Sequence, residues 1–112
     1  MLGAEEFQQV MAVAAQGDED AFAALWHAHQ PALVRYLQVV AAPGAAEDLA
    51  SEVWLVVARQ LGRFRGDERG FRAWLVEIGR RQAMGWRRRH ARHPVLVLPP
   101  ESKCPLWDAV LA

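Results

Sequence analysis

Apolar side chains recur every three to four positions along most of the first 90 residues, and this periodicity restricts the chain to an all-α fold. In the first long segment, eight of them share one stripe about 120° wide on a helical projection. Asp18 is a suitable N-cap before this segment, and Pro43-Gly44 breaks the chain after it. Pro31 lies on the opposite side, so we expect one kinked helix. The stripe consists of Phe22, Leu25, Trp26, His29, Leu33, Tyr36, Leu37 and Val40.

Two further helices are expected, one from about Ala45 and one, capped by Asp67, that runs to about Arg92. A short helix within residues 1–16 would add Phe7, Val10, Met11 and Ala14. The expected apolar sides are Ala46, Leu49, Ala50, Val53, Trp54, Val57 and Leu61, and then Phe71, Trp74, Leu75, Ile78 and Gln82. Prolines at 94, 99, 100 and 105 forbid a continuous helix beyond residue 93. The sequence therefore predicts a compact three- to four-helix bundle with an extended, proline-rich C-terminal tail.

Composition narrows the class of protein further. The chain has 112 residues and one cysteine, Cys104, which excludes an internal disulfide and fits a reducing cytoplasm. No apolar run is long enough for a membrane helix, so we expect a cytoplasmic protein with no membrane partner. Catalytic motifs such as GxxxxGK[ST], GxGxxG and GxSxG are absent, and we expect neither an enzyme nor a cofactor. Scattered histidines make a poor metal site, and His29 is expected to be a hydrogen-bonded core residue.

The net charge of zero conceals a segregation of charge along the chain. Residues 1–56 carry eight acids and one base, a net of −7, whereas residues 57–93 carry eleven arginines and three acids, a net of +8. Residues 94–112 contribute −1. A basic block of this density favours a polyanion or an acidic protein surface as partner. The alternative is that the two blocks neutralise each other within one fold.

The basic block mixes arginines with aromatic residues around the expected loop. Phe64 and Phe71 alternate there with Arg63, Arg65, Arg69 and Arg72. Arginine attracts phosphate and aromatic pockets accept unstacked bases, so the combination favours single-stranded or melting DNA. On the last helix, Arg69, Arg80 and Arg87 form one row and Arg81 and Arg88 an adjacent row, suited to phosphate contact. Two alternatives stay open: both rings anchor the loop in the core, or the arginines form a solvated face.

Residues 17–92 resemble region 2 of the extracytoplasmic-function (ECF) sigma factors, which are bacterial transcription initiation subunits. Three blocks carry the resemblance: GDEDAFAAL at 17–25 with PALVRYL at 31–37, AEDLASEVW at 46–54 leading to Phe64-Arg65-Gly66, and FRAWLVEIGRR at 71–81. Residues 106–112 resemble the start of region 4 of that family, whose remainder would be missing. The resemblance thus implies a sigma region 2 domain at 1–93, a linker at 94–105 and a truncated start of region 4 at 106–112.

The resemblance also implies a function for individual positions. In the family, the second helix docks on the clamp helices of the β′ subunit of RNA polymerase; the matching residues are Asp48, Ser51, Glu52, Leu55 and Arg59. The following loop captures a flipped base of the non-template strand of the promoter −10 element and helps to melt it. The matching DNA-binding residues are Arg63, Phe64, Arg65, Gly66, Asp67, Arg69, Phe71 and Arg72, with Arg80, Arg81, Arg87 and Arg88 on the next helix.

Two positions depart from the family, which usually has glutamine or another polar residue where Ser51 stands and often asparagine where Arg81 stands. An anti-sigma factor is a further expected partner. Two other functions are compatible with the residues alone. One is a helix-turn-helix regulator of duplex DNA, which requires a turn of three or four residues before its recognition helix. The other is a helical interaction module that binds no DNA.

Overall fold

Asp18 begins the first long helix, as the sequence predicts, because its Oδ1 accepts a hydrogen bond from the backbone N–H of Ala21 at 2.8 Å. This helix, α2, runs over Glu19–Val40 and continues through the exposed Pro31 as one element. The computed structural model describes residues 3–90. Before α2 lies a short helix, α1, at Ala4–Ala14, which confirms the helix expected within residues 1–16.

The second half of the described chain forms another pair of helices. The helix α3 spans Ala46–Gln60 and ends in a 3₁₀ turn, η1, at Leu61–Arg63. The helix α4 spans Glu68–Arg89, and Asp67 caps it by accepting a hydrogen bond from the N–H of Gly70 at 2.9 Å. The expected end near Arg92 lies outside the described residues, as do the expected linker at 94–105 and the region 4 start at 106–112.

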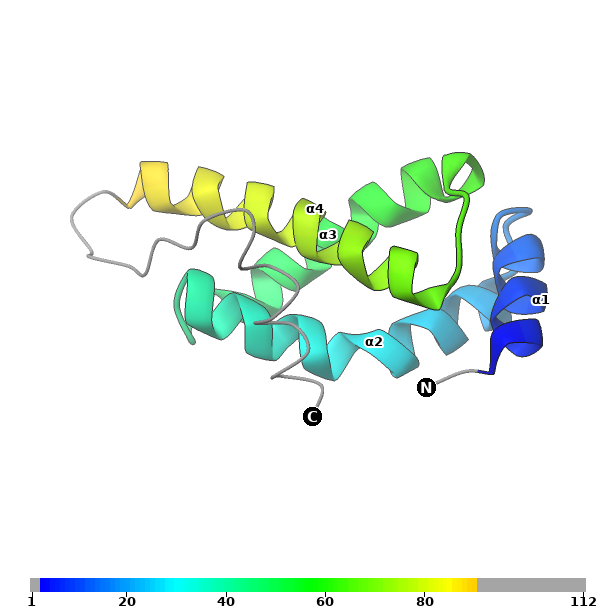
Figure 1. The fold of residues 1–112 in the computed structure, drawn as a ribbon. Helices are drawn as coiled ribbons and strands as arrows, with labels where there is room; N and C mark the ends of the chain where they lie inside the picture. The colour runs from blue at the N-terminus through cyan, green and yellow to red at the C-terminus, as the bar shows by residue number, and fades with distance from the viewer. Residues whose placement is uncertain (1–2, 91–112) are drawn as a thin grey trace.

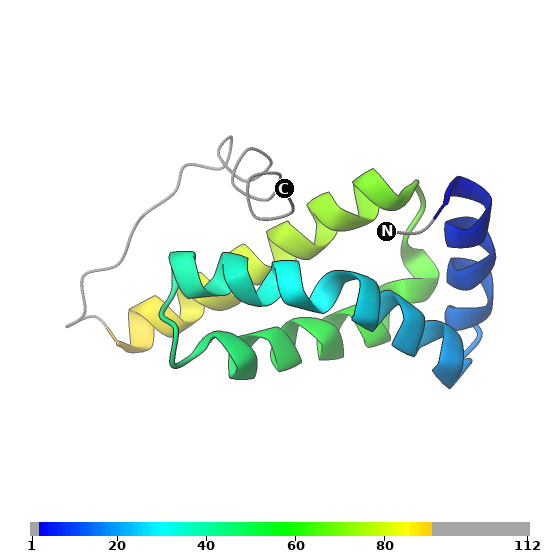
Figure 2. The same ribbon diagram turned by 90° about the horizontal axis from the view of Figure 1, so that it is seen from below.

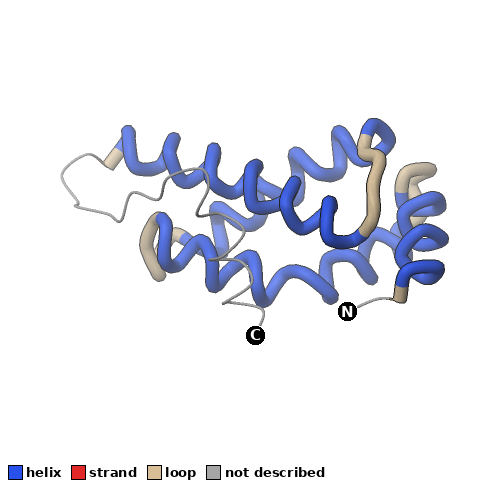
Figure 3. The backbone as a smooth tube through the Cα atoms, in the orientation of Figure 1, coloured by secondary structure: helices blue, strands red, loops and turns tan. Residues whose placement is uncertain are grey.

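The helices α2, α3 and α4 lie alongside one another, and α1 crosses one end of this bundle (Figures 1 and 2). The loop between η1 and α4 passes over the same end, next to α1 (Figure 3). All four helices contribute buried side chains to a single core, whose largest fully buried members are Tyr36, Phe7, Phe71, Leu25, Leu33, Leu37, Leu49 and Leu75. The predicted all-α bundle is therefore confirmed, and within residues 3–90 no helix is long and apolar enough to span a membrane.

The predicted core stripes need four corrections. Trp26 is 38% exposed, and Phe22, Trp74 and Gln82 are only half-buried, because helical spacing alone does not show where a neighbouring helix ends. On α4 the core instead takes Val76, Gly79 and Ala83. Gly79 packs against α2, and a Cβ at that position would lie 3.5 Å from Leu33 Cδ1 and 3.6 Å from Tyr36 Cε2, which are ordinary van der Waals distances.

Candidate functional site

The loop from Phe64 to Asp67 is held in place by its own polar groups. Arg65 donates two hydrogen bonds from Nη1, to the carbonyl oxygens of Gly62 at 2.9 Å and of Phe64 at 2.8 Å. Gly66 has a φ of 144°, which favours glycine, and the ring of Phe64 lies 3.1 Å from the position that a Cβ would occupy. Gln8 on α1 donates from Nε2 to the Gly66 carbonyl at 3.1 Å. Three of the predicted DNA-binding positions, at 65, 66 and 67, thus help to fix the loop.

Phe71 lies at the centre of an aromatic cluster behind this loop. Its ring is fully buried, with centroids 5.8 Å from Phe7, 5.7 Å from Phe64 and 5.9 Å from Trp74. Phe64 is half-buried and stacks on Trp74 at 5.2 Å with an interplanar angle of 23°. Because the Phe71 ring has no exposed surface in this structure, its position fits the alternative of a core anchor for the loop.

The arginines of the loop and α4 differ in solvent exposure and in their ion pairs. Arg80 binds Glu77 through two nitrogens, with Nη2–Oε2 at 2.8 Å and Nε–Oε1 at 3.3 Å, and its side chain is 25% exposed. Hydrogen bonding to Glu77 raises the pKa of Arg80 above its ordinary value. Arg81 also contacts Glu77, at 3.1 Å, but its side chain is 74% exposed. Of the remaining predicted arginines, Arg72 and Arg87 are half-buried, whereas Arg63, Arg69 and Arg88 are exposed.

The outer face of α3 has a different character. All five of its predicted docking residues are exposed, namely Asp48, Ser51, Glu52, Leu55 and Arg59. Leu55 is 56% exposed, the largest exposure among the large apolar side chains that the structure describes. The hydroxyl of Ser51 donates to the carbonyl oxygen of Glu47 at 3.2 Å within the helix. Among residues 3–90, Leu55 therefore lies outside the buried core, on a face that also carries exposed carboxylates.

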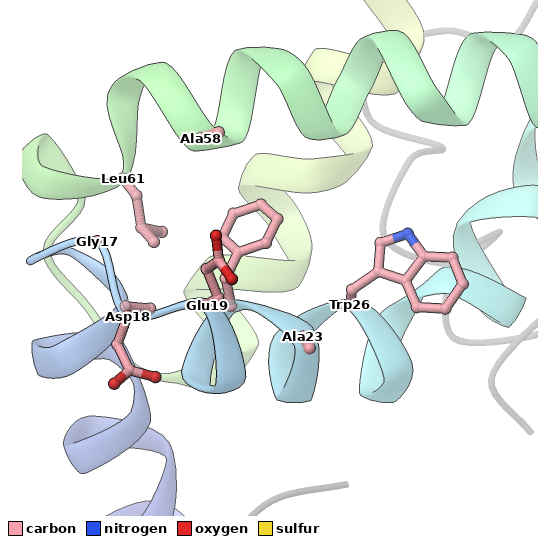
Figure 4. A pocket seen from close by; sticks show the side chains of 9 residues that line it. Gly17, Asp18, Glu19, Ala23, Trp26, Ala58 and Leu61 are labelled. Atoms are coloured by element: carbon pink, nitrogen blue, oxygen red, sulfur yellow. The ribbon is translucent and has the colours of Figure 1, made fainter.

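Two hollows flank α3. A cleft of about 250 Å³ separates it from α4 and is lined by Val56, Gln60, Trp74, Glu77, Ile78, Arg81 and Gln82. A more apolar groove of about 450 Å³ lies where the start of α2 meets the end of α3. Figure 4 shows Trp26 and Glu19 rising from α2 on one side of this groove, with Ala58 and Leu61 opposite them. Within residues 3–90, no three His, Cys, Asp or Glu side chains gather closely enough to hold a metal ion.

His29 is buried on α2, as predicted, but the expected hydrogen bond is not formed. Its Nε2 lies 3.2 Å from Oε2 of Glu68, the first residue of α4, yet neither ring nitrogen has a partner in hydrogen-bonding geometry within the described part of the chain. Burial, reinforced by the nearby Arg72 guanidinium, lowers the pKa of His29 from 6.5 to about 4. The Glu68 carboxylate favours the protonated ring, but burial outweighs it, so the ring is neutral at pH 7.

This depressed pKa predicts that stability falls with acidification. An unfolded histidine binds a proton near pH 6.5 and the folded one only near pH 4, so the unfolded state gains protons first. Above pH 6.5 His29 is largely neutral in both states, so its titration does not affect stability there. Protonation of the unfolded state alone then lowers the free energy of unfolding by about 2 kcal/mol between pH 7 and pH 5. Urea unfolding at both pH values measures this loss. His29→Leu should not show this loss of stability between pH 7 and pH 5. An equal loss in the variant and the wild type would contradict the attribution to His29.

The matching family model decides the class of the chain. The family is sigma-70 region 2, and its model matches residues 25–93, from the second turn of α2 to beyond the described end of α4. The chain belongs to the sigma-70 region 2 family. The matched segment contains the α3 face, the loop and α4, so every predicted site residue of this sigma region 2 domain falls within it.

One similar protein indicates which group of sigma factors the domain resembles. It is the ECF RNA polymerase sigma factor BldN of Streptomyces coelicolor, which is 40% identical to this chain over 65 residues. The aligned part makes up 57% of this chain and 25% of BldN, so the chain matches about a quarter of the length of that relative. No solved structure matches the chain significantly. The resemblance to region 2 of the ECF sigma factors is therefore confirmed.

Sequence reasoning missed several features of this sigma region 2 domain. The ion pairs of Glu77 with Arg80 and Arg81 could have been inferred from their spacing of three and four residues on one helix. The contact of Gln8 with Gly66 spans 58 residues, and no local pattern predicts it. The same holds for the cleft between α3 and α4, because its lining is assembled only when the two helices pack.

Proposed function

We propose that this chain is the part of an ECF sigma factor that binds core RNA polymerase and the promoter −10 element when transcription begins. Membership of the sigma-70 region 2 family supports the general role. The observation that carries the proposal is the separation of two unlike surfaces on the bundle. The acidic α3 face with the exposed Leu55 suits a protein, and the arginine-rich loop and α4 suit DNA. Two partners can therefore bind at once.

The α3 face is assigned to the clamp helices of the β′ subunit. A large apolar side chain among charged ones is typical of a protein interface, where burial of the apolar group contributes affinity and the charges contribute specificity. Leu55 would supply the apolar contact, and Asp48, Glu52 and Arg59 the charged ones. Ser51 contributes less, because its hydroxyl is already bonded within α3.

The cleft between α3 and α4 is assigned to the flipped base of the −10 element. Trp74 offers an aromatic wall, and the amides of Gln60 and Gln82 can donate to and accept from the edge of a base. Extruding a base costs a few kcal/mol, which such contacts would offset. Trp74 also stacks on Phe64, so the cleft adjoins the loop. Arg81 lines the cleft and is well exposed, which suits a contact with the adjacent phosphate.

The alternative functions receive less support. A helix-turn-helix needs a turn of three or four residues, but the segment between α3 and α4 runs from Leu61 to Asp67 and contains the 3₁₀ turn η1. An interaction module without DNA binding gives the cluster of exposed arginines no partner. The proposed polymerase partner implies a cytoplasmic location. We also infer an anti-sigma partner that covers α2, where the groove beside Trp26 offers an apolar surface.

The proposal is tested by DNA binding of the chain in complex with a β′ clamp-helix fragment. A single-stranded oligonucleotide library with a randomised window identifies the preferred sequence, and the complex should bind that strand more tightly than its duplex. Arg81→Ala should weaken binding and reduce the slope of log K against log salt concentration by about 0.7, the value for one phosphate of a single strand. Arg35→Ala on α2 serves as the matched control and should leave the slope unchanged. Preference for the duplex, or binding insensitive to salt, would contradict the proposal.

A further inference from the structure

We propose that His29 is a positioning residue for the DNA-binding loop, which acts through Glu68 and Phe71 and does not itself touch DNA. The inference rests on the proposed function, because it assigns His29 a role in the binding of the −10 strand. Three observations carry it: the burial of the His29 ring, its short contact with the first residue of α4, and its packing against the aromatic anchor of the loop.

A histidine at this position costs the core more than an apolar side chain of similar size would. Its side chain is completely buried, yet neither Nδ1 nor Nε2 is hydrogen-bonded within residues 3–90. Buried polar atoms without hydrogen bonds destabilise a fold, and an apolar side chain of similar size would avoid that cost. Polar groups that weaken a core while lying beside a binding surface are often retained for that surface. The surroundings of the ring indicate which part of the surface is concerned.

Two contacts of the His29 ring, with Glu68 and with Phe71, connect it to the loop. Glu68 directly follows the cap residue Asp67, and its Oε2 lies 3.2 Å from His29 Nε2. The ring centroid of His29 is also 5.2 Å from that of Phe71, which in turn packs against Phe64 in the loop. His29 therefore touches the first turn of α4 and the side chain that anchors the loop. We therefore expect a substitution of His29 to displace both the first turn of α4 and the Phe71 side chain.

The contact between His29 and Glu68 is close to a hydrogen bond, but the hydrogen bond is not formed in this structure. It has the length of a hydrogen bond but not its geometry, so a small rotation of the first turn of α4 would align the Nε2 proton with the carboxylate. Because burial lowers the pKa of His29 to about 4, the ring is neutral and can donate a single proton from Nε2. We expect a base bound in the adjoining cleft to favour this small rotation, so that the completed bond stabilises the bound conformation over the free one.

The test compares His29→Leu with His29→Gln, whose amide nitrogen reaches about as far as Nε2, and with the matched control His27→Leu at an exposed site on the same helix. His29→Leu should keep or raise the thermal midpoint and retain affinity for the β′ fragment. Affinity of the complex for the selected single strand should fall about tenfold. His29→Gln should recover most of that loss, and His27→Leu should change nothing.

Glu68→Ala removes the same contact by changing the other residue, whose side chain is 13% exposed whereas that of His29 is fully buried. It should cause a similar loss of DNA affinity, and the double variant should lose no more than either single one, because both act through one contact. In the wild type, the imidazole ¹⁵N shifts of His29 should change when the strand is added.

Three outcomes would overturn the inference. The first is a folded His29→Leu that binds the strand as the wild type does. The second is a parallel loss of thermal midpoint, β′ affinity and DNA affinity, which would make His29 merely structural. The third is an additive double variant. Failure of the proposed function is distinguishable from all three, because the wild type itself would then bind neither the β′ fragment nor the strand, and the inference would fall with it.

Discussion

Replacing Glu52 with lysine is expected to abolish binding of the chain to a β′ clamp-helix fragment while leaving the bundle folded. Glu52 is exposed on α3, one turn from Leu55, and forms no ion pair within residues 3–90. The substitution therefore breaks no ion pair within residues 3–90. It does reverse the charge at the centre of the proposed interface, and a charge that no longer complements its partner costs several kcal/mol where the two surfaces meet. Titration calorimetry with the purified fragment measures the loss directly.

The control for this experiment is Glu6→Lys, which makes the same change of charge at an exposed position on α1. It should bind the fragment as the wild type does, because α1 lies across the end of the bundle and α3 carries the docking face (Figure 2). Far-UV circular dichroism establishes that both variants are folded. Normal binding by a folded Glu52→Lys would show that the docking face is misassigned.

Replacing Phe71 with alanine should lower the free energy of unfolding by about 3–5 kcal/mol, the usual cost of truncating a buried phenylalanine. The Phe71 ring has no solvent exposure and packs against aromatic rings from α1, α2, α3 and the loop. Those neighbours belong to separate elements that hold one another in place, so they cannot collapse easily into the space left behind. Urea unfolding followed by circular dichroism gives the free energy.

Phe22→Ala is the matched comparison, because Phe22 is only half-buried and its recorded ring contact is with Trp54, at 5.8 Å. Its loss should be clearly smaller. A Phe71→Ala variant that unfolds at nearly the wild-type urea concentration would mean that the aromatic cluster does not hold the loop. In that case, Phe71 would have to be reconsidered as a residue that reaches a base.

Periodicity and capping residues were sufficient to predict the helices. Asp18 and Asp67 cap α2 and α4 as expected, and the predicted apolar side of α3 is buried from Ala46 to Leu61. These predictions succeed because they depend on neighbours within one or two turns. The exposed α3 face follows from the same reasoning, since residues opposite a buried stripe must face outward. The loop and α4 could be identified as a DNA-binding region from their arginines, but the part played by each residue could not.

The amino-acid sequence alone thus establishes the helices, their buried sides, the segregation of charge and the resemblance to ECF sigma region 2. Packing between distant segments establishes the rest. It buries Phe71 and leaves Trp74 half-buried, holds Arg80 more tightly than Arg81, and forms the cleft between α3 and α4. It also brings His29 to Glu68, 39 positions further along the chain. The spacing of residues along one helix predicts which of its faces is apolar. A contact between two helices also depends on how closely they approach, and the pattern of neither helix alone predicts that distance.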